Sequence, residues 1–177
     1  MHLPWRGVPP GEGTQPISTS LTPNEAAALG RLAAGRDVLE VGSAFGYSAC
    51  VMALAGARHV TAVDPHVQLG SYEAMVSNLD RCGVAGVVTV VRGASPDALA
   101  GLGGPFGLVF IDGDHGAAAV HADVEAGRKV LADGGMLAVH DLGEDCCCPG
   151  VRAALEALFP EGPSEHVDTL AVYRGVA

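Results

Sequence analysis

Short runs of apolar, often β-branched residues alternate with longer amphipathic segments along most of the chain. Continuous apolar strands separated by helices are typical of a parallel sheet that is covered by helices on both faces. The predicted strands are Asp37–Val41, His59–Val63, Val87–Val91, Gly107–Asp112 and Met136–Asp141. The predicted helices between and after them are Gly46–Gly56, Val67–Cys82, Pro96–Gly101, Ala117–Ala132 and Gly150–Phe159.

Two further segments flank this alternation. Thr22 and Pro23 have the pattern of a helix N-cap and a first helical position, and this helix is expected to end near Gly35. Two short strands, Ser164–Asp168 and Thr169–Arg174, are so close in sequence that they predict an antiparallel hairpin at one sheet edge. The predicted fold is therefore α/β, a Rossmann-like doubly wound sheet of about seven strands, mostly parallel with an antiparallel C-terminal hairpin.

The chain of 177 residues has room for one domain, since domains typically contain about 100–200 residues. Residues 1–22 are rich in Pro, Gly, Ser and Thr and are expected to form an irregular N-terminal arm. Residues 23–177 are expected to form the folded domain. The arm is a candidate for folding over a site or a partner.

The charge balance restricts the partners of the protein. Twenty acidic side chains against ten basic ones give a formal net charge of −10, which disfavours nucleic acid and anionic lipid. No apolar run approaches the roughly 18–20 residues of a membrane span. The five cysteines are odd in number and three are adjacent, which suits a reduced compartment. We therefore expect a cytoplasmic protein that binds neither nucleic acid nor membrane.

The ends of the first two predicted strands indicate a cofactor site. Gly42 and Gly46 stand four residues apart, which differs from the glycine spacing of a dinucleotide fingerprint. Glu40, within the strand end, would repel a pyrophosphate but could hold an ammonium group. Asp64 ends the second strand, where a carboxylate can accept hydrogen bonds from ribose hydroxyls. Each feature alone could equally serve turn formation, but together they predict a cationic, adenosine-bearing cofactor.

These residues resemble the first two motifs of class I S-adenosylmethionine-dependent methyltransferases, in Leu39-Glu40-Val41-Gly42-Ser43-Ala44-Phe45-Gly46-Tyr47-Ser48 and Val63-Asp64. The resemblance covers about residues 22–177 and implies that the domain binds S-adenosylmethionine. Tyr47 and Ser48 resemble the catechol and caffeoyl-coenzyme A O-methyltransferase branch, and this resemblance implies that Ile17–Ser20 is the segment that covers the cofactor. The cofactor-binding residues implied are Glu40, Gly42, Ser43, Gly46, Tyr47, Ser48, Asp64, Pro65, Ala94, Ser95 and Asp112.

A second group of polar residues follows the fourth and fifth predicted strands. Asp112, His115, His140 and Asp141 should converge, because the carboxyl ends of parallel strands meet at one edge of the sheet. Asp112 and Asp141 are the expected ligands of Mg²⁺ or another divalent cation, with His140 as a third ligand or as a residue that orients Asp141. His115 is the expected general base, since imidazole titrates near neutral pH.

The Asp-Gly-Asp-His and His-Asp pattern resembles bacterial metal-dependent small-molecule O-methyltransferases, a group that includes macrolide-sugar enzymes and relatives of the cephalosporin hydroxylase-associated protein. That resemblance implies Mg²⁺ bound by Asp112 and by the acidic pair that ends strand five, with the loop histidine as base. Here the pair is His140-Asp141, and the aspartate-asparagine pair of plant and catechol enzymes corresponds to Asp141-Leu142.

The remaining notable side chains have structural explanations. Asp114 is expected to cap the helix that follows it, and His121 to lie on the surface of that helix. Cys50 and Cys82 are expected in the core. The adjacent residues 146–148 are all cysteines but lack the spacing with which two thiolates hold one zinc ion.

The function predicted from the sequence is O-methyl transfer from S-adenosylmethionine to a hydroxyl of a small metabolite of secondary metabolism. A homodimer or the N-terminal arm is expected to complete the acceptor pocket. Two alternatives remain at this point. One is a metal-dependent hydrolase or oxygenase-like enzyme that uses the Asp and His cluster. The other is a non-catalytic module that only binds S-adenosylmethionine.

Overall fold

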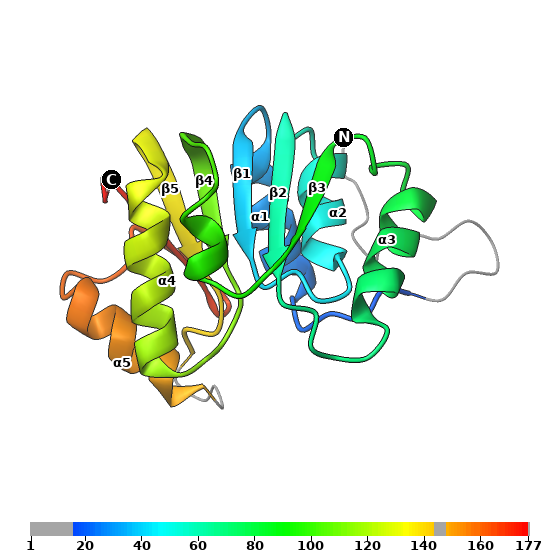
Figure 1. Cartoon of the computed structure of the whole chain (residues 1–177). Coiled ribbons are helices and arrows are strands. Elements are labelled where there is room, and N and C mark those ends of the chain that lie inside the picture. Colours follow the sequence, from blue (N-terminus) through cyan, green and yellow to red (C-terminus); the bar gives the residue numbers. More distant parts are fainter. Residues whose placement is uncertain (1–15, 144–147, 177) are drawn as a thin grey trace.

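A computed structural model of the chain describes residues 16–143 and 148–176. These residues form one seven-stranded sheet in the order β3-β2-β1-β4-β5-β7-β6 (Figure 1). The first five strands are parallel, whereas β7 runs antiparallel to both β5 and β6. The predicted fold class, including the C-terminal hairpin, is confirmed. The strands are β1 (Asp37–Val41), β2 (His59–Asp64), β3 (Val88–Arg92), β4 (Phe106–Ile111), β5 (Leu131–Val139), β6 (Glu165–Val167) and β7 (Leu170–Arg174).

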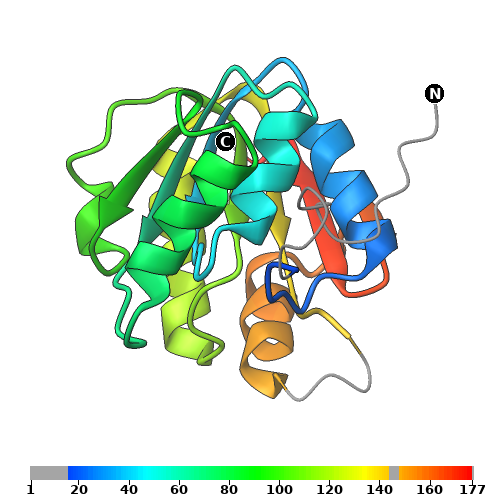
Figure 2. The same ribbon diagram turned by 90° about the vertical axis from the view of Figure 1, so that its right-hand side faces the viewer.

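Helices cover both faces of the sheet, as expected for parallel strands that are apolar on both sides. One face is covered by α1, α2 and α3, and the other by α4, α5 and the short 3₁₀ helix η1 (Figure 1). The C-terminal hairpin lies beside α1 (Figure 2). The helices are α1 (Pro23–Ala33), α2 (Tyr47–Leu54), α3 (Ser71–Arg81), η1 (Asp97–Leu99), α4 (Ala117–Lys129) and α5 (Pro149–Leu158).

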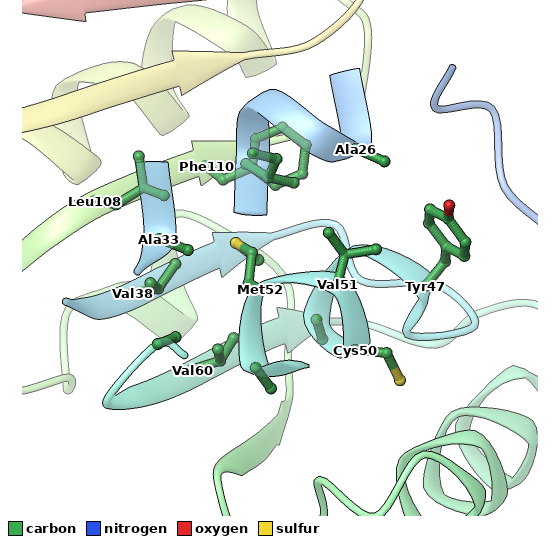
Figure 3. Close-up of a cluster of buried hydrophobic side chains, with 14 of the residues drawn as sticks. Ala26, Ala33, Val38, Tyr47, Cys50, Val51, Met52, Val60, Leu108 and Phe110 are labelled. Atoms are coloured by element: carbon green, nitrogen blue, oxygen red, sulfur yellow. The ribbon is translucent and has the colours of Figure 1, made fainter. Parts of the chain in front are cut away.

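Two apolar clusters, one on each face, stabilise this arrangement. On the α1 and α2 face, Met52 and Val51 of α2 pack toward Val38 of β1 and Phe110 of β4 (Figure 3). All four side chains are fully buried. Burial of this kind is the main favourable contribution to folding, so the sheet and its helices form a rigid support for the residues that follow the strands.

Four predicted elements have boundaries that differ from those in the structure, and two of these differences have a local cause. Helix α3 begins at Ser71 and not at Val67, because Gly70 adopts a left-handed conformation (φ 80°) and forms the N-cap. Strand β5 begins at Leu131 and not at Met136, since Leu131 pairs with Phe106 across an irregularity in register. The helix predicted from Pro96 to Gly101 is only the single 3₁₀ turn η1, and the helix predicted to reach Ala132 ends at Lys129.

The start of α1 is confirmed. Thr22 is its N-cap, and the Thr22 hydroxyl and the Glu25 carboxylate form a reciprocal capping box. Most of the predicted arm lies outside the described residues, but Ile17 and Leu21 are buried against the α1 and α2 face. Within residues 16–143 and 148–176, no helix has the length and apolarity that a membrane crossing requires.

Candidate active site

Backbone pairing aligns the residues that follow β1, β4 and β5. The amide of Gly42 donates to the Val63 carbonyl at 2.9 Å, and the amide of Asp112 donates to the Val41 carbonyl at 2.8 Å. The amide of His140 donates to the Ile111 carbonyl at 3.0 Å. These bonds extend the parallel ladder by one residue, so three chemically distinct strand ends are held side by side.

Gly42 is required where β1 meets β4. Its φ is +89°, and a Cβ atom built on it would lie 2.0 Å from the Asp112 carbonyl oxygen. Any side chain at this position would both strain the backbone and collide with a neighbouring strand end. Two cavities adjoin this close contact, and both include Gly42 and Asp112 in their lining.

The first cavity has a volume of about 430 Å³, within the usual range for small-ligand sites. It runs from the end of β1 across the ends of β2 and β3. Six of the residues predicted to bind the cofactor line it: Gly42, Asp64, Pro65, Ala94, Ser95 and Asp112.

Asp64 organises the wall of this cavity. Its Oδ2 accepts a hydrogen bond from the Ala44 amide at 2.8 Å, and its Oδ1 accepts one from the His66 amide at 2.6 Å. Each carboxylate oxygen can accept more than one bond, so Asp64 retains capacity for ligand hydroxyls. The carboxylate therefore fixes two loops and can still contact a ribose.

The second cavity, of about 260 Å³, adjoins the first and shares Gly42, Ala44 and Asp112 with it. His115 lies on its wall, and the segment from Ser18 to Leu21 forms the opposite part of the lining. This segment overlaps the expected ligand-covering segment Ile17–Ser20 in three residues, while Ile17 is buried in the core. Three more of the predicted cofactor residues line this second cavity: Ser43, Tyr47 and Ser48.

Two predicted cofactor residues line neither cavity. Gly46 is the left-handed N-cap of α2 (φ 81°) and shapes the loop from beneath. Glu40 is fully buried, and no described residue forms a hydrogen bond with either of its carboxylate oxygens. Glu40 thus lies within the strand end, as the sequence indicated, and its expected contact with an ammonium group stays a prediction.

The environment of Glu40 changes its protonation. Burial raises the pKa of Glu40 to about 8, the Ser48 hydroxyl opposes this rise, and the charges of Asp112 and Asp64 add to it. In the ligand-free protein at neutral pH this side chain is therefore mostly a neutral acid beneath the β1–α2 loop.

The four residues predicted to converge after β4 and β5 are brought together. His115 Nε2 lies 2.7 Å from Asp141 Oδ2. His140 Nδ1 lies 3.4 Å from Asp141 Oδ1 and 3.3 Å from Asp112 Oδ1. Asp141 has a φ of 66°, an uncommon conformation for a residue other than glycine, and its two oxygens lie near two different histidines.

His140 is the most enclosed member of this cluster, with a side-chain exposure of 2%. Burial lowers its pKa, but interactions with Asp112 and Asp141 raise it to about 11. The same contact with His140 is the main cause that lowers the pKa of Asp141. Although Nδ1 is close to both carboxylates, it forms a hydrogen bond of acceptable geometry with neither, nor with any other described group.

The cluster fits a divalent cation. Asp112, His140 and Asp141 each present one ligand atom, and these atoms lie within 4.8 Å of one another. The buried Nδ1 has no hydrogen-bond partner among the described residues and becomes a nitrogen ligand when a cation displaces its proton, and the two carboxylates supply charge. His115, Asp141 and Cys148 form a second such group, so Cys148 lies beside the site. Cys146 and Cys147 lie outside the described residues.

Sequence reasoning missed two buried acids near the cavities. Asp123 of α4 is 2% exposed, lines the first cavity and has its pKa raised by burial. Asp123 lies between Val120 and Val124, whose side chains are buried in the core, and this position could have indicated that Asp123 is buried too. Glu25 of α1 contacts His140, and its position in a capping box gave no sign of that long-range contact.

The other structural interpretations mostly hold. His121 is exposed and Cys50 is buried, whereas Cys82 is only partly buried. Asp114 accepts a hydrogen bond from the Gly116 amide at 2.7 Å, but the N-cap of α4 is Gly116 and not Asp114. The aspartate therefore closes the turn before the helix.

Comparison with known proteins identifies the family. A family model described as a methyltransferase domain matches residues 39–142, which is more than half of the chain. The chain belongs to this methyltransferase family. The matched region of the family runs from β1 to just beyond β5, and so contains both cavities and the Asp and His cluster.

Among the proteins similar to this chain is a catechol O-methyltransferase of Mycobacterium tuberculosis, 36% identical over 117 residues. The match covers 60% of this chain and 53% of that protein, so the chain spans about half the length of this curated relative. The cofactor-bound structure of Rv0187 from MTB is 26% identical, with a TM-score of 0.72 over 86% of this chain and 80% of that one.

Another structure shares the fold at lower identity. The O-methyltransferase from Bacillus cereus in complex with SAH is 22% identical, with a TM-score of 0.67 over 81% of this chain and 72% of that one. Together with the family match, these similarities confirm the resemblance to class I S-adenosylmethionine-dependent methyltransferases.

Proposed function

We propose that this protein transfers the methyl group of S-adenosylmethionine to a hydroxyl oxygen of a small metabolite, with the help of a divalent cation. The main support is the position of the His115 and Asp141 pair, 2.7 Å apart, at a cavity that shares a wall with the larger cavity. The catechol O-methyltransferase relative supports the same reaction class.

The larger cavity is the proposed site of the methyl donor. Asp64 would accept hydrogen bonds from the ribose, and Ala94 and Ser95 would contact the adenine, since they follow β3 at the far end of the cavity. The loop from Gly42 to Gly46 would surround the methionine part. Its sulfonium methyl would then face the smaller cavity, across the shared wall.

His115 is the proposed general base. If Nε2 donates to Asp141, the other ring nitrogen is left with a lone pair that can accept the proton of an acceptor hydroxyl. The deprotonated oxygen forms a bond to the methyl carbon while the bond from that carbon to sulfur breaks. The products are a methyl ether and S-adenosylhomocysteine, and the proton remains on His115.

Asp112, His140 and Asp141 would hold the cation, which the sequence resemblance suggests is Mg²⁺. When bound, such an ion lowers the pKa of a coordinated hydroxyl and orients it for attack. Asp141 has a second role, since its Oδ2 orients His115 while its Oδ1 faces the proposed metal position. Asp141 makes both contacts from a left-handed backbone conformation.

The test is a methyl-transfer screen over hydroxylated small molecules, with Mg²⁺ and with chelator, using wild-type protein, His115→Ala and His121→Ala. We expect His115→Ala to lower kcat about 10²–10⁴-fold with little change in S-adenosylhomocysteine affinity. The exposed His121 lies on α4 and lines neither cavity, so its variant is the matched control. Turnover that is unaffected by loss of His115 would contradict the assigned base.

A homodimer, a cytoplasmic location and a role in secondary metabolism are further proposals made from the sequence. In this proposal a second copy completes the smaller cavity around the acceptor. Light scattering on the full chain tests this, and a monomeric mass would contradict it.

A further inference from the structure

Glu25 of α1 has unusually many partners for a helix-capping residue. It is fully buried, and four donors surround its carboxylate. Oε1 accepts from the Thr169 amide and the Thr169 hydroxyl, both at 2.7 Å. Oε2 accepts from the Thr22 amide at 2.7 Å and lies 3.3 Å from His140 Nε2. Only the bond to Thr22 is needed for helix capping, so the other contacts require a different explanation.

These contacts determine which nitrogen of His140 carries a proton. Nε2 faces Glu25 Oε2 and also Thr169 Oγ1, at 3.2 Å. The hydroxyl proton of Thr169 is directed to Glu25, so its oxygen can only accept from the imidazole. Both neighbours of Nε2 are therefore acceptors, and Nε2 must carry a proton. In the neutral ring, the lone pair is then on Nδ1, which faces Asp112 and Asp141.

We propose that Glu25, with Thr169, is the positioning residue of the metal site, holding His140 in the orientation and tautomer that present Nδ1 as a ligand. This inference rests on the metal site of the proposed function. A carboxylate that accepts from the far nitrogen of a ligating histidine fixes the ring and makes it a stronger ligand. The contact joins residues 115 positions apart, from α1 and from the end of β5.

The proposal also explains why the C-terminal hairpin adjoins α1 (Figure 2). The turn between β6 and β7 presents Thr169 to Glu25, and the preceding residue Asp168 accepts from the Thr22 hydroxyl at 2.6 Å. Asp168 thus anchors the start of α1 to the same turn without touching His140. It is a matched control, because its carboxylate has the same charge and a neighbouring location.

The experiment measures binding of Mn²⁺, by the loss of the free-ion EPR signal, to wild-type protein and to Glu25→Gln and Asp168→Asn. The Gln variant preserves side-chain size but removes the charge and one acceptor. We expect Glu25→Gln to weaken Mn²⁺ binding about 10–100-fold, and Asp168→Asn to change it by less than about 3-fold. Calorimetry with S-adenosylhomocysteine should give wild-type affinity for both variants, which shows that the fold is intact.

Nitrogen NMR of the Mg²⁺-loaded protein provides a readout that a purely structural role would not change. The wild type should show His140 protonated at Nε2, and Glu25→Gln should show an increased share of the Nδ1-protonated form. If Glu25→Gln does not fold, Thr169→Val removes the second acceptor of Nε2, and we expect a smaller loss of Mn²⁺ affinity, about 3–10-fold.

Unchanged Mn²⁺ affinity in Glu25→Gln, or in Thr169→Val where only that variant folds, would overturn this inference alone. An equal loss in Asp168→Asn would also overturn it, since the effect would then come from anchoring α1. Failure of the wild-type protein to bind Mn²⁺ would overturn the inference together with the metal part of the proposed function.

Discussion

At the scale of single residues, the charged form of Glu40 has opposite effects on the stability of the fold and on the binding of a cationic ligand. A buried carboxyl without a hydrogen-bond partner destabilises a protein in its charged form. The pKa of Glu40 is raised to about 8, so the ligand-free protein keeps this group protonated at neutral pH. A cationic ligand close to the β1–α2 loop would favour the charged form. In the proposed function, Glu40 would thus lower the stability of the free protein and raise its affinity for a cationic ligand.

This conflict predicts a pH-dependent stability. Between the unfolded pKa of 4.5 and the folded value of about 8, the folded state binds one more proton than the unfolded state. The free energy of unfolding should therefore fall by ~1.4 kcal/mol per pH unit across this interval, an upper limit for one group. The contribution of protonated Glu40 to the free energy of unfolding is complete below the unfolded pKa of 4.5. It is lost as the pH rises through the folded pKa of about 8.

Glu40→Gln should flatten this dependence and raise the Tm of the ligand-free protein at pH ~8, while weakening S-adenosylmethionine binding. Thermal unfolding at several pH values, with and without ligand, measures both effects. Glu73→Gln is the control, because Glu73 lies exposed in the first turn of α3. Parallel profiles of Tm against pH for wild type and Glu40→Gln would contradict the raised pKa of Glu40 in the folded protein.

At the scale of elements, α5 restricts the loop that bears the proposed base. A Cβ atom on Gly150, in the first turn of α5, would lie 2.3 Å from the His115 carbonyl oxygen and 2.7 Å from the Ala117 amide nitrogen. The helix and the loop are in backbone contact, so the position of His115 depends on how closely α5 approaches. A glycine in a helix is otherwise unfavourable, which indicates a packing requirement here.

Gly150→Ala should therefore displace the 113–116 loop and lower kcat, about 10–100-fold for a shift near 1 Å. Gly101→Ala is the matched control, since nothing lies within 4 Å of a Cβ atom built there. Steady-state kinetics would measure the loss of kcat, and calorimetry with S-adenosylhomocysteine would show whether binding at the donor site is unchanged. Wild-type kcat in Gly150→Ala would show that the loop accommodates the methyl group.

Elements and strand ends could be predicted, whereas contacts between distant elements could not. Apolar runs predict the parallel strands, and the alignment of parallel strand ends then brings Asp112 near Asp141. The contact of Glu25 with Thr169 depends on how the C-terminal hairpin lies against α1, across 144 residues of sequence. The start of α3 was missed because Val67 and Leu69 have apolar side chains and yet are exposed in the preceding loop.

At the scale of the whole molecule, the excess of acidic side chains creates a field that favours cations. The formal net charge is −10, and the carboxylates of Asp64, Asp112 and Asp114 line the larger cavity. S-adenosylmethionine has a positive sulfonium that S-adenosylhomocysteine lacks. The field therefore favours the methyl donor over the spent product.

Salt should reduce this preference. Raising NaCl from about 0.05 to 0.5 M shortens the Debye length from roughly 14 to 4 Å. We expect the affinity ratio of S-adenosylmethionine to S-adenosylhomocysteine to fall several-fold over this range, as measured by calorimetry. The neutral product is the internal control for general effects of salt. A constant ratio would show that only short-range contacts discriminate the two.

The wall that Gly42, Ala44 and Asp112 contribute to both cavities has a kinetic consequence. A molecule in the larger cavity becomes part of the boundary of the smaller one, so the acceptor can bind in its reactive position only afterwards. We expect a compulsory order, with donor first and demethylated donor last. S-adenosylhomocysteine should then inhibit competitively against S-adenosylmethionine but not against the acceptor, and the order of binding would follow from one shared strand end.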